Sequence, residues 1–241
     1  MTPDGGAPRT AGPLPLRALP VGDHGLLIEL NGDEEVEALH AELLRRAAAG
    51  TLPAVREIVP AARTVFLDGL ADPLTLGAEL AGWRIPPLSA GDRPAVEIPV
   101  RYDGPDLAEV AALWGVTPDE VVRSHSGTAF RVAFCGFAPG FGYLTGLPER
   151  LHVPRRATPR TRVPVGSVGL AGPYTGVYPR PSPGGWQLIG RTDAVLWDPR
   201  REPAALLAPG TPVCFVPVDA PVPAPRTAPS RPERLPEEPA R

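Results

Sequence analysis

Arginine side chains, hydroxyl groups and turn-forming residues are concentrated in one section of the chain, from Phe134 to Thr192. No acidic residue occurs between Glu149 and Asp193, whereas seven arginines do. The chain of 241 residues has a formal net charge of −3, so the part outside these arginines carries roughly −10. Such a charge asymmetry indicates an anionic substrate or partner. The seven are Arg150, Arg155, Arg156, Arg160, Arg162, Arg180 and Arg191.

The spacing of four of these arginines favours the binding of carboxylate or phosphate. They lie within the nine residues 154–162, where prolines hold the segment extended. A guanidinium group binds either anion through two parallel hydrogen bonds. Ser167, Thr175 and Ser182 follow in turns of small residues, which allow a ligand to approach the backbone closely. A solvated basic surface is the alternative interpretation of the same pattern.

The residue types exclude several kinds of chemistry. All 24 basic residues are arginines, so the chain has no lysine for a Walker A motif, a Schiff base or a kinase-type nucleotide site. Metal-ligand spacing and a GxSxG motif are also absent from the sequence. Cys135 and Cys214 lie in apolar runs, which predicts buried, reduced thiols. We interpret His125 as a helix-end residue that contacts the last carbonyls, and a catalytic pair with Cys135 is the less favoured alternative.

The net acidic charge and the lack of a standard recognition module argue against nucleic-acid binding. The amino terminus has no signal-peptide pattern, and no apolar run approaches the ~18 residues of a membrane span. We therefore expect a cytoplasmic protein. Residues 1–15 and 218–241 are rich in proline and poor in apolar residues, so a mobile leader and a disordered tail are predicted.

A small α+β domain is predicted over residues 16–88. Its first helix should bury one apolar face, with Asn31 or Asp33 as the N-cap. That face comprises Val36, Leu39, Leu43 and Ala47. The expected order of strand, helix, strand, strand and helix occupies residues 25–30, 33–50, 55–59, 63–67 and 73–82.

A second domain is predicted over residues 89–217. After a strand at 95–100, two helices are expected, and the second begins at Thr117 with a capping box. From Ala129 onward short strand candidates alternate with proline and glycine turns, which is typical of a β-barrel or sandwich. These strand candidates are 130–134, 165–171, 186–191, 194–197 and 211–218.

The section Gly136–Thr192 resembles the signature region of one protein family, and Glu120–Phe134 resembles its lead-in. The family includes the B subunit of 5-oxoprolinase, allophanate hydrolase subunit 1 and a bacterial sporulation-kinase inhibitor. The resemblance extends from about Leu16 to Val216. It implies an α+β fold, with a small α/β domain of ferredoxin-like type followed by a cyclophilin-like β-barrel domain. One departure is Pro173-Tyr174, where the family pattern has a glycine or an Asn-Gln type pair.

The resemblance further implies one component of an ATP-hydrolysing enzyme that opens 5-oxoproline to glutamate. Its expected partners are a second barrel protein, the C component of such an enzyme, and a lactam-hydrolysing protein, the A component. ATP, with Mg²⁺, is the expected co-substrate, at a site shared with a partner. By position in the motif, His125 and Arg160 are the candidate catalytic residues. The candidate substrate- or phosphate-binding residues are Tyr143, Arg155, Arg156, Ser167, Thr175, Ser182 and Arg191.

Other members of the family suggest two alternatives. The chain could be a carboxyltransferase component of the allophanate hydrolase and urea carboxylase type, which would require a biotin-carrier partner. It could also be a binding module that inhibits a histidine kinase without catalysis. Prolyl isomerisation, suggested only by the cyclophilin-like fold, is not expected, since a fold does not confer an activity.

Overall fold

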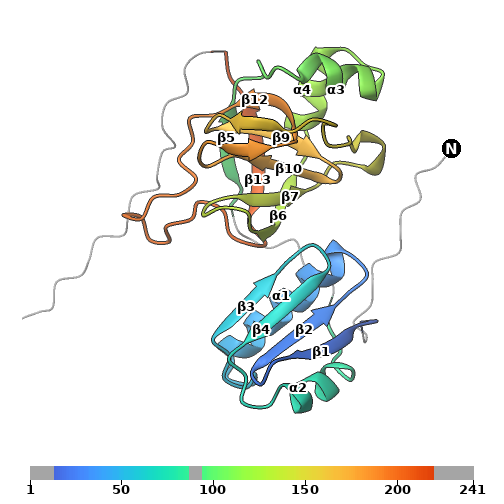
Figure 1. Ribbon diagram of the computed structural model, residues 1–241, viewed down its shortest axis with the longest axis vertical. Coiled ribbons are helices and arrows are strands. Elements are labelled where there is room, and N and C mark those ends of the chain that lie inside the picture. The colour runs from blue at the N-terminus through green and yellow to red at the C-terminus, as the bar shows by residue number, and fades with distance from the viewer. Residues whose placement is uncertain (1–13, 87–93, 220–241) are drawn as a thin grey trace, which may run out of the picture.

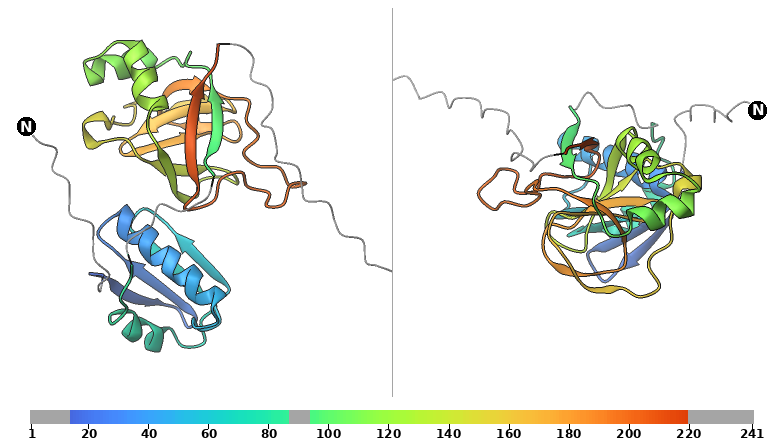
Figure 2. Two further views of the ribbon diagram at one scale, coloured as in Figure 1. Left: turned by 180° about the vertical axis from the view of Figure 1, so that it is seen from behind. Right: turned by 90° about the horizontal axis from the view of Figure 1, so that it is seen from above.

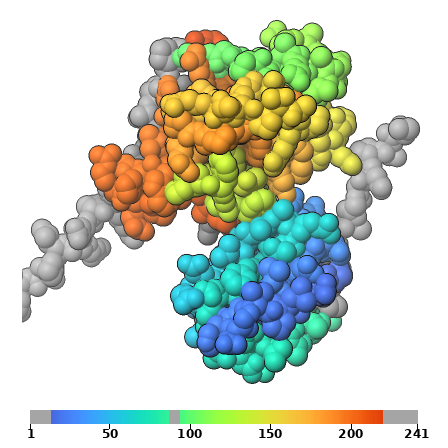
Figure 3. Space-filling model, in the orientation of Figure 1, coloured from blue at the N-terminus to red at the C-terminus, as the bar shows by residue number. Residues whose placement is uncertain are grey.

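The computed structural model describes residues 14–86 and 94–219 of the chain. They form two lobes joined across a narrow waist, with the amino-terminal unit below the barrel in the view of Figure 3. Most of the predicted leader, the predicted boundary near residue 89 and most of the predicted tail lie outside the described residues. Leu14, which falls within the predicted leader, is buried in the amino-terminal core. None of the helices in the described ranges is long and apolar enough to cross a membrane.

The amino-terminal unit is an antiparallel four-stranded sheet with strand order β1-β2-β4-β3, and α1 covers one of its faces (Figures 1 and 2). The hairpin strand β1 was not predicted. Its elements are β1 (Arg17–Val21), β2 (Gly25–Glu29), α1 (Asp33–Ala48), β3 (Glu57–Pro60), β4 (Thr64–Asp68) and α2 (Pro73–Leu80).

Helix α1 follows its prediction on the buried face but not at its two ends. Val36, Leu39 and Leu43 are buried, as predicted, but Ala47 is exposed because the last turn extends beyond the sheet. The predicted cap is wrong. Gly32 is the N-cap residue and no side chain caps the helix, which leaves Asp33 free to make contacts elsewhere.

The second unit is a seven-stranded sheet that curves into a barrel, with strand order β12-β9-β10-β7-β6-β13-β5. Two reciprocal backbone hydrogen bonds of 2.9 Å between Arg101, just after β5, and Arg191 of β12 join its two edges. The main strands are β5 (Val96–Val100), β6 (Phe130–Cys135), β7 (Gly142–Thr145), β9 (Ser167–Ala171), β10 (Tyr174–Val177), β12 (Gln187–Arg191) and β13 (Pro212–Pro217). The predicted α+β class, with an α/β unit followed by a barrel, is confirmed.

Two short helices pack on each other at the end of the barrel far from the amino-terminal unit (Figure 1). They are α3 (Leu107–Trp114) and α4 (Pro118–Ser126). The predicted capping box at Thr117 is present, because its hydroxyl accepts from the Glu120 amide and the carboxylate of Glu120 accepts from the Thr117 amide. A separate two-stranded ribbon pairs β8 (Arg160–Val163) with β11 (Ser182–Gly184).

Some predictions within the barrel are wrong. Strands β10 and β11 occupy segments interpreted as turns of small residues, because their proline and glycine content masked a strand pattern, and β7 was not predicted. Strand β8 begins within residues 154–162, which were predicted to be extended but not paired in a sheet. Residues 194–197 form no strand and pair only at Trp197, with Ala205. The prediction of buried thiols is wrong: Cys135 is exposed at the last position of β6, and Cys214 is half-buried, because it alternates with the buried Val213 and Phe215 on β13.

Candidate functional site

The loop between β6 and β7 presents an exposed aromatic side chain on a strained backbone. Phe137 has φ of 65°, and the amide of Ala138 donates to the carbonyl of Gly136 at 2.7 Å across it. This pattern is a γ-turn of the rare, strained type. A second turn follows, in which Gly140 adopts φ of 84° and Phe141 donates to Ala138 at 2.9 Å. The loop therefore holds Phe137, with 54% of its surface exposed, at a cost in backbone energy.

Tyr143 lies at the centre of a cluster of aromatic rings beside this loop. Its ring stacks on Phe134 with centroids 4.4 Å apart and meets Phe141 edge-on at 5.0 Å. Tyr174 and Trp186 approach it edge-on as well, each at 5.6 Å. We call the following seven residues the aromatic surface, of which Phe137 is exposed, Tyr143 and Tyr174 are half-buried and the other four are buried: Phe134, Phe137, Phe141, Tyr143, Tyr174, Tyr178 and Trp186.

Arg155 is an unpaired cation beside the aromatic surface. It is exposed and makes no hydrogen bond or ion pair with another residue of the described ranges. Burial raises the pKa of Tyr143, and the nearby charge of Arg155 partly offsets that rise. The same charge acts on Tyr178. The amide of Arg156 donates to the carbonyl of Gly185 at 2.8 Å, which fixes the backbone next to Arg155.

Arg156 and Arg160 bind a carboxylate of the chain itself. Both donate to Oδ1 of Asp106, at 2.8 and 2.7 Å, and the amide of Leu188 donates to Oδ2 at 2.7 Å. Asp106 is buried, whereas the two arginines are half-buried. Their predicted role as ligand-binding cations therefore competes with an internal ion pair.

The ion pair leaves some hydrogen-bonding capacity unused. Within the described residues, Nε of Arg156, Nη1 of Arg160 and Oε1 of Gln187 are buried without a partner. The side-chain amide of Gln187 reaches Glu109 at 3.4 Å, and Arg156 reaches the same carboxylate at 3.3 Å. These residues form one polar network under the ribbon of β8 and β11.

Arg191 is likewise paired, on the surface. Its Nη2 lies 2.6 Å and its Nε 3.0 Å from Oδ2 of Asp103. Asp103, Asp106 and Glu109 all precede Arg150, the first of the seven arginines, by more than 40 residues, so the acid-free interval in the sequence concealed them. The basic section is therefore partly neutralised by one acidic segment at the start of α3.

The three predicted hydroxyl residues are buried and point into the barrel or its turns. Ser167 donates to the carbonyl of Pro164 at 2.8 Å, and Ser182 donates to that of Arg180 at 3.3 Å. Thr175 is fully buried. These hydroxyl groups bond within the chain and therefore do not form, together with Arg155, a set of hydrogen-bond donors for one ligand.

His125 lies in the barrel core and not at an exposed helix end. Its ring is fully buried between Phe130 and Phe215, with centroid distances of 4.9 and 4.7 Å. Nδ1 lies 2.8 Å from the hydroxyl of Tyr102, and Nε2 lies 3.4 Å from that of Thr175. Burial lowers the pKa of His125 to about 3, so its ring is neutral at pH 7. In this position His125 packs in the core of the barrel, where a ligand in solvent cannot contact it.

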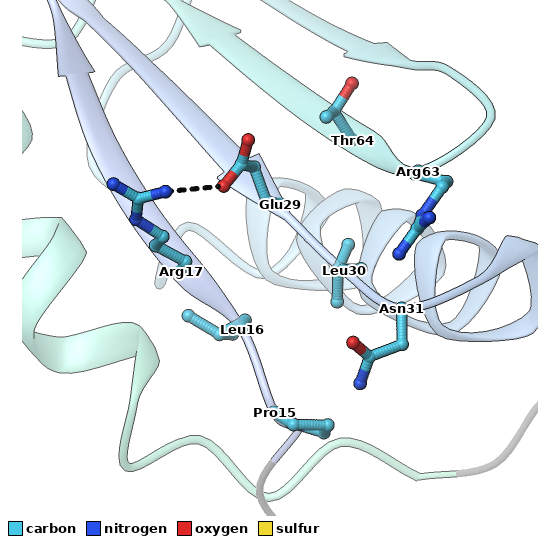
Figure 4. A pocket seen from close by; sticks show the side chains of 8 residues that line it. All are labelled: Pro15, Leu16, Arg17, Glu29, Leu30, Asn31, Arg63 and Thr64. Carbon is cyan, nitrogen blue, oxygen red and sulfur yellow. Dashed lines mark hydrogen bonds and ion pairs between the residues drawn. The ribbon is translucent and has the colours of Figure 1, made fainter.

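A separate cavity of about 590 Å³ opens in the amino-terminal unit, at the edge of the sheet where β2 ends and β4 begins (Figure 4). Arg17 and Glu29, which face each other across β1 and β2, form an ion pair at its wall with a separation of 3.4 Å. Asn31 and Arg63 line the opposite side. The cavity contains no residue of the aromatic surface and none of the predicted site residues.

Sequence reasoning singled out Tyr143 and Arg155 but missed most of the aromatic surface. The missing signal was pairing between strands, because Phe134 and Tyr143 are opposite each other in the register of β6 and β7. Tyr174 and Trp186 come from β10 and from the turn before β12, which were interpreted as ligand-cradling turns.

Comparison with known proteins identifies the relatives of this chain. A family model described as the carboxyltransferase domain, subdomain C and D, matches residues 16–207. The B subunit of 5-oxoprolinase from Escherichia coli O157:H7 is 58% identical over 125 residues, which are 51% of this chain and 57% of that protein. The B subunit of 5-oxoprolinase from Haemophilus influenzae (strain Rd) is 46% identical over 158 residues, 64% of this chain and 74% of that protein.

Among solved structures, TTHA0988 is similar with a TM-score of 0.69 and 36% identity. The similarity covers 83% of this chain but only 40% of that one. The matched region thus spans less than two thirds of the Escherichia coli relative and of this longer solved chain.

Proposed function

Because the chain belongs to the family of the carboxyltransferase domain, subdomain C and D, we propose that it is the B subunit of an ATP-dependent 5-oxoprolinase. The enzyme would cleave 5-oxoproline to L-glutamate. Two relatives that carry the name of this 5-oxoprolinase component, at 58% and 46% identity, support the assignment. The aromatic surface with the unpaired cation Arg155 is the site that we assign to the substrate.

The single observation that carries the site assignment is the position of Arg155 beside Tyr143 and Tyr178. 5-Oxoproline has a nearly planar lactam ring and one carboxylate. Aromatic rings offer apolar faces for such a ring, and an unneutralised guanidinium group binds the carboxylate through two hydrogen bonds. Arg156 and Arg160 already hold Asp106, and of the two remaining arginines in the 154–162 segment Arg155 is the one whose charge acts on both tyrosines.

The residues of this surface fit one anionic group and not a whole nucleotide. Arg155 supplies a single free cation, and the described residues contain no group of three acidic, histidine or cysteine side chains that could hold a metal ion. We therefore propose that ATP and Mg²⁺ are held jointly with a partner protein. ATP would supply a phosphoryl group to the lactam carbonyl oxygen, with release of ADP, which would activate the carbonyl carbon toward attack by water and make the oxygen leave as phosphate.

The contribution of this chain is then to bind and orient the lactam. Arg155 holds the substrate carboxylate, and the rings of Tyr143 and its neighbours exclude water from one face of the lactam. Hydrogen-bond donors that are already in position stabilise the transition state most in such a partly dry environment, because they need not reorganise as charge develops on the substrate. In this arrangement Arg160 acts through its bond to Asp106, and we assign it a positioning role. We assign His125 a positioning role as well, because its ring contacts the hydroxyl of Thr175 on β10.

A complete active site would require partner proteins. The similar region in TTHA0988 is only 40% of a longer chain, so in that protein further sequence accompanies it. We propose as partners a second barrel protein, the C component of the enzyme, and a lactam-hydrolysing protein, its A component. A cytoplasmic location, where ATP is available, stays a prediction.

Co-expression with the two partner proteins tests the assignment. We expect the three proteins to co-purify and to convert 5-oxoproline to glutamate only when ATP is added. Carboxylation of urea in the presence of a biotin carrier would instead indicate the urea carboxylase type. Tight binding to a histidine kinase without any turnover would indicate the inhibitor type. The names of the relatives favour neither alternative.

A further inference from the structure

Tyr174 touches both the aromatic surface and the amino-terminal unit. Its ring meets Phe134 edge-on at 5.5 Å and Tyr143 edge-on at 5.6 Å. Its hydroxyl donates to Oδ1 of Asp33 at 3.1 Å and lies 3.4 Å from Oδ2. One side chain therefore connects the proposed substrate surface with the first residue of α1, on the side of the barrel that faces the amino-terminal unit (Figure 1).

The backbone holds the Tyr174 end of this connection firmly. Tyr174 begins β10 directly after a tight turn at Gly172, whose φ is 55°, and it pairs with Ala171 of β9. The next residue, Thr175, pairs with Leu144 of β7 and contacts His125 in the core. Tyr174 can thus transmit a movement of Asp33 to the aromatic rings but cannot easily rotate away from them.

The environment keeps the phenol protonated and therefore a donor. Burial raises the pKa of Tyr174, and the charge of Asp33 raises it further. Burial also raises the pKa of Asp33, while the hydrogen bond from Tyr174 lowers it. A phenol donating to a carboxylate is a charge-assisted hydrogen bond, which is stronger than a neutral one.

A second contact on the same face of α1 supports the first. Glu37 lies one helical turn after Asp33, and its carboxylate is 3.8 Å from Nε of Arg131 on β6. Residues four apart on a helix share a face, so the two contacts together fix the rotation of α1 against the barrel.

We propose that Tyr174 is a positioning residue through which the amino-terminal unit sets the geometry of the substrate surface. The hydrogen bond to Asp33 holds the Tyr174 ring against Tyr143, which in turn lies beside Arg155. Only the kinetic consequence of this inference rests on the proposed function.

The kinetic test uses Tyr174→Phe in the reconstituted three-protein enzyme, because phenylalanine keeps the ring and removes only the donor. We expect KM for 5-oxoproline to rise three- to tenfold with kcat changed less than twofold. Asp33→Ala should give the same split, and the double variant should be no worse than either single one. Glu34→Gln, a change in the same helical turn at a residue outside the contact, is the matched control and should leave KM unchanged. Unchanged KM in Tyr174→Phe, or fully additive effects in the double variant, would overturn the proposal.

A second measurement is independent of the activity. In the full chain alone, amide hydrogen exchange should become faster in the first turn of α1 and at the start of β10 in Tyr174→Phe, with β12 unaffected. If the wild-type enzyme shows no turnover of 5-oxoproline, the proposed function fails, while this measurement still decides the connection. Exchange in α1 equal to that of the wild type would contradict it.

Discussion

Arg160 donates to Oδ1 of Asp106 at 2.7 Å, across 54 residues of sequence, and this bond places the arginine in a polar network of the barrel. Arg156 shares the same oxygen atom. Asp106 also accepts from the amide of Leu188 and so joins α3 to β12. An arginine cluster that indicates an anion site in the sequence thus already contains its own carboxylate.

Asp106→Asn is expected to destabilise the protein by about 3 kcal/mol, because Arg160 loses its carboxylate partner and Arg156 keeps only Glu109. Urea unfolding measures the difference. Arg162→Ala, on the same strand as Arg160 but exposed, is the control and should lie within about 0.5 kcal/mol of the wild type. A loss below about 1 kcal/mol in Asp106→Asn would mean that the network contributes little and that Arg156 and Arg160 are available to a ligand.

Arg155→Ala should behave in the opposite way. We expect its unfolding free energy to stay within about 0.5 kcal/mol of the wild type, since the side chain has no ion pair to lose. Its kcat/KM for 5-oxoproline should fall at least about tenfold, the effect of losing one charged hydrogen bond to the substrate. Arg150→Ala is the control at another exposed arginine. Kinetics equal to those of the wild type would remove Arg155 from the site.

The strain at Phe137 can be measured by comparing two variants that both lack the ring. Phe137→Gly should be more stable than Phe137→Ala by about 1 kcal/mol, because glycine adopts a φ of 65° without steric cost. Thermal or urea unfolding gives the difference. Equal stability of the two variants would show that the γ-turn stores no energy. Both variants should lose activity if the exposed ring contacts a ligand or partner.

Glu37 provides a test by pH. Burial is the largest cause that raises its pKa to about 7, with Asp33 and Glu34 adding to the rise and Arg131 opposing it. The folded state then holds the Glu37 proton more tightly than the unfolded state, so this contribution to stability is complete below the unfolded pKa of 4.5 and is lost as pH rises through about 7.

The difference in unfolding free energy between wild type and Glu37→Gln should therefore fall by up to roughly 3 kcal/mol between pH 4.5 and 8. The half-buried His40 and the buried His125, whose pKa values burial lowers, act in the opposite sense on the wild type. Both histidines are present in each protein, so their effect cancels in the difference. A difference that is independent of pH would contradict the raised pKa of Glu37.

The parts of the fold that could be predicted are those determined by local chemistry. The capping box at Thr117 and the start of α2 at Pro73 depend on neighbouring residues, and both occur as predicted. Strand β10 was not predicted, because a turn pattern dominates its sequence. Its pairing with β7 and β9, which lie elsewhere in the chain, makes it a strand.

The site was predictable only in part for the same reason. Arg155 and Tyr143 could be chosen by residue type. Whether an arginine is free to bind a ligand, however, depends on ion pairs with acids distant in sequence, such as Asp106 and Asp103, and these pairs form only in the folded chain. The spacing of His125 indicates a helix end, and it is indeed the second-last residue of α4, but the helix directs its ring into the core. Periodicity over nine residues cannot distinguish these orientations.

The most direct test of the proposed function is the formation of glutamate from 5-oxoproline by the two partner proteins with and without this chain. With the chain present and ATP added, we predict glutamate and ADP in equal amounts. With the chain omitted, or replaced by Arg155→Ala, the rate should fall at least about tenfold. Full ATP-dependent glutamate formation in the absence of this chain would contradict its assignment as a component of the enzyme.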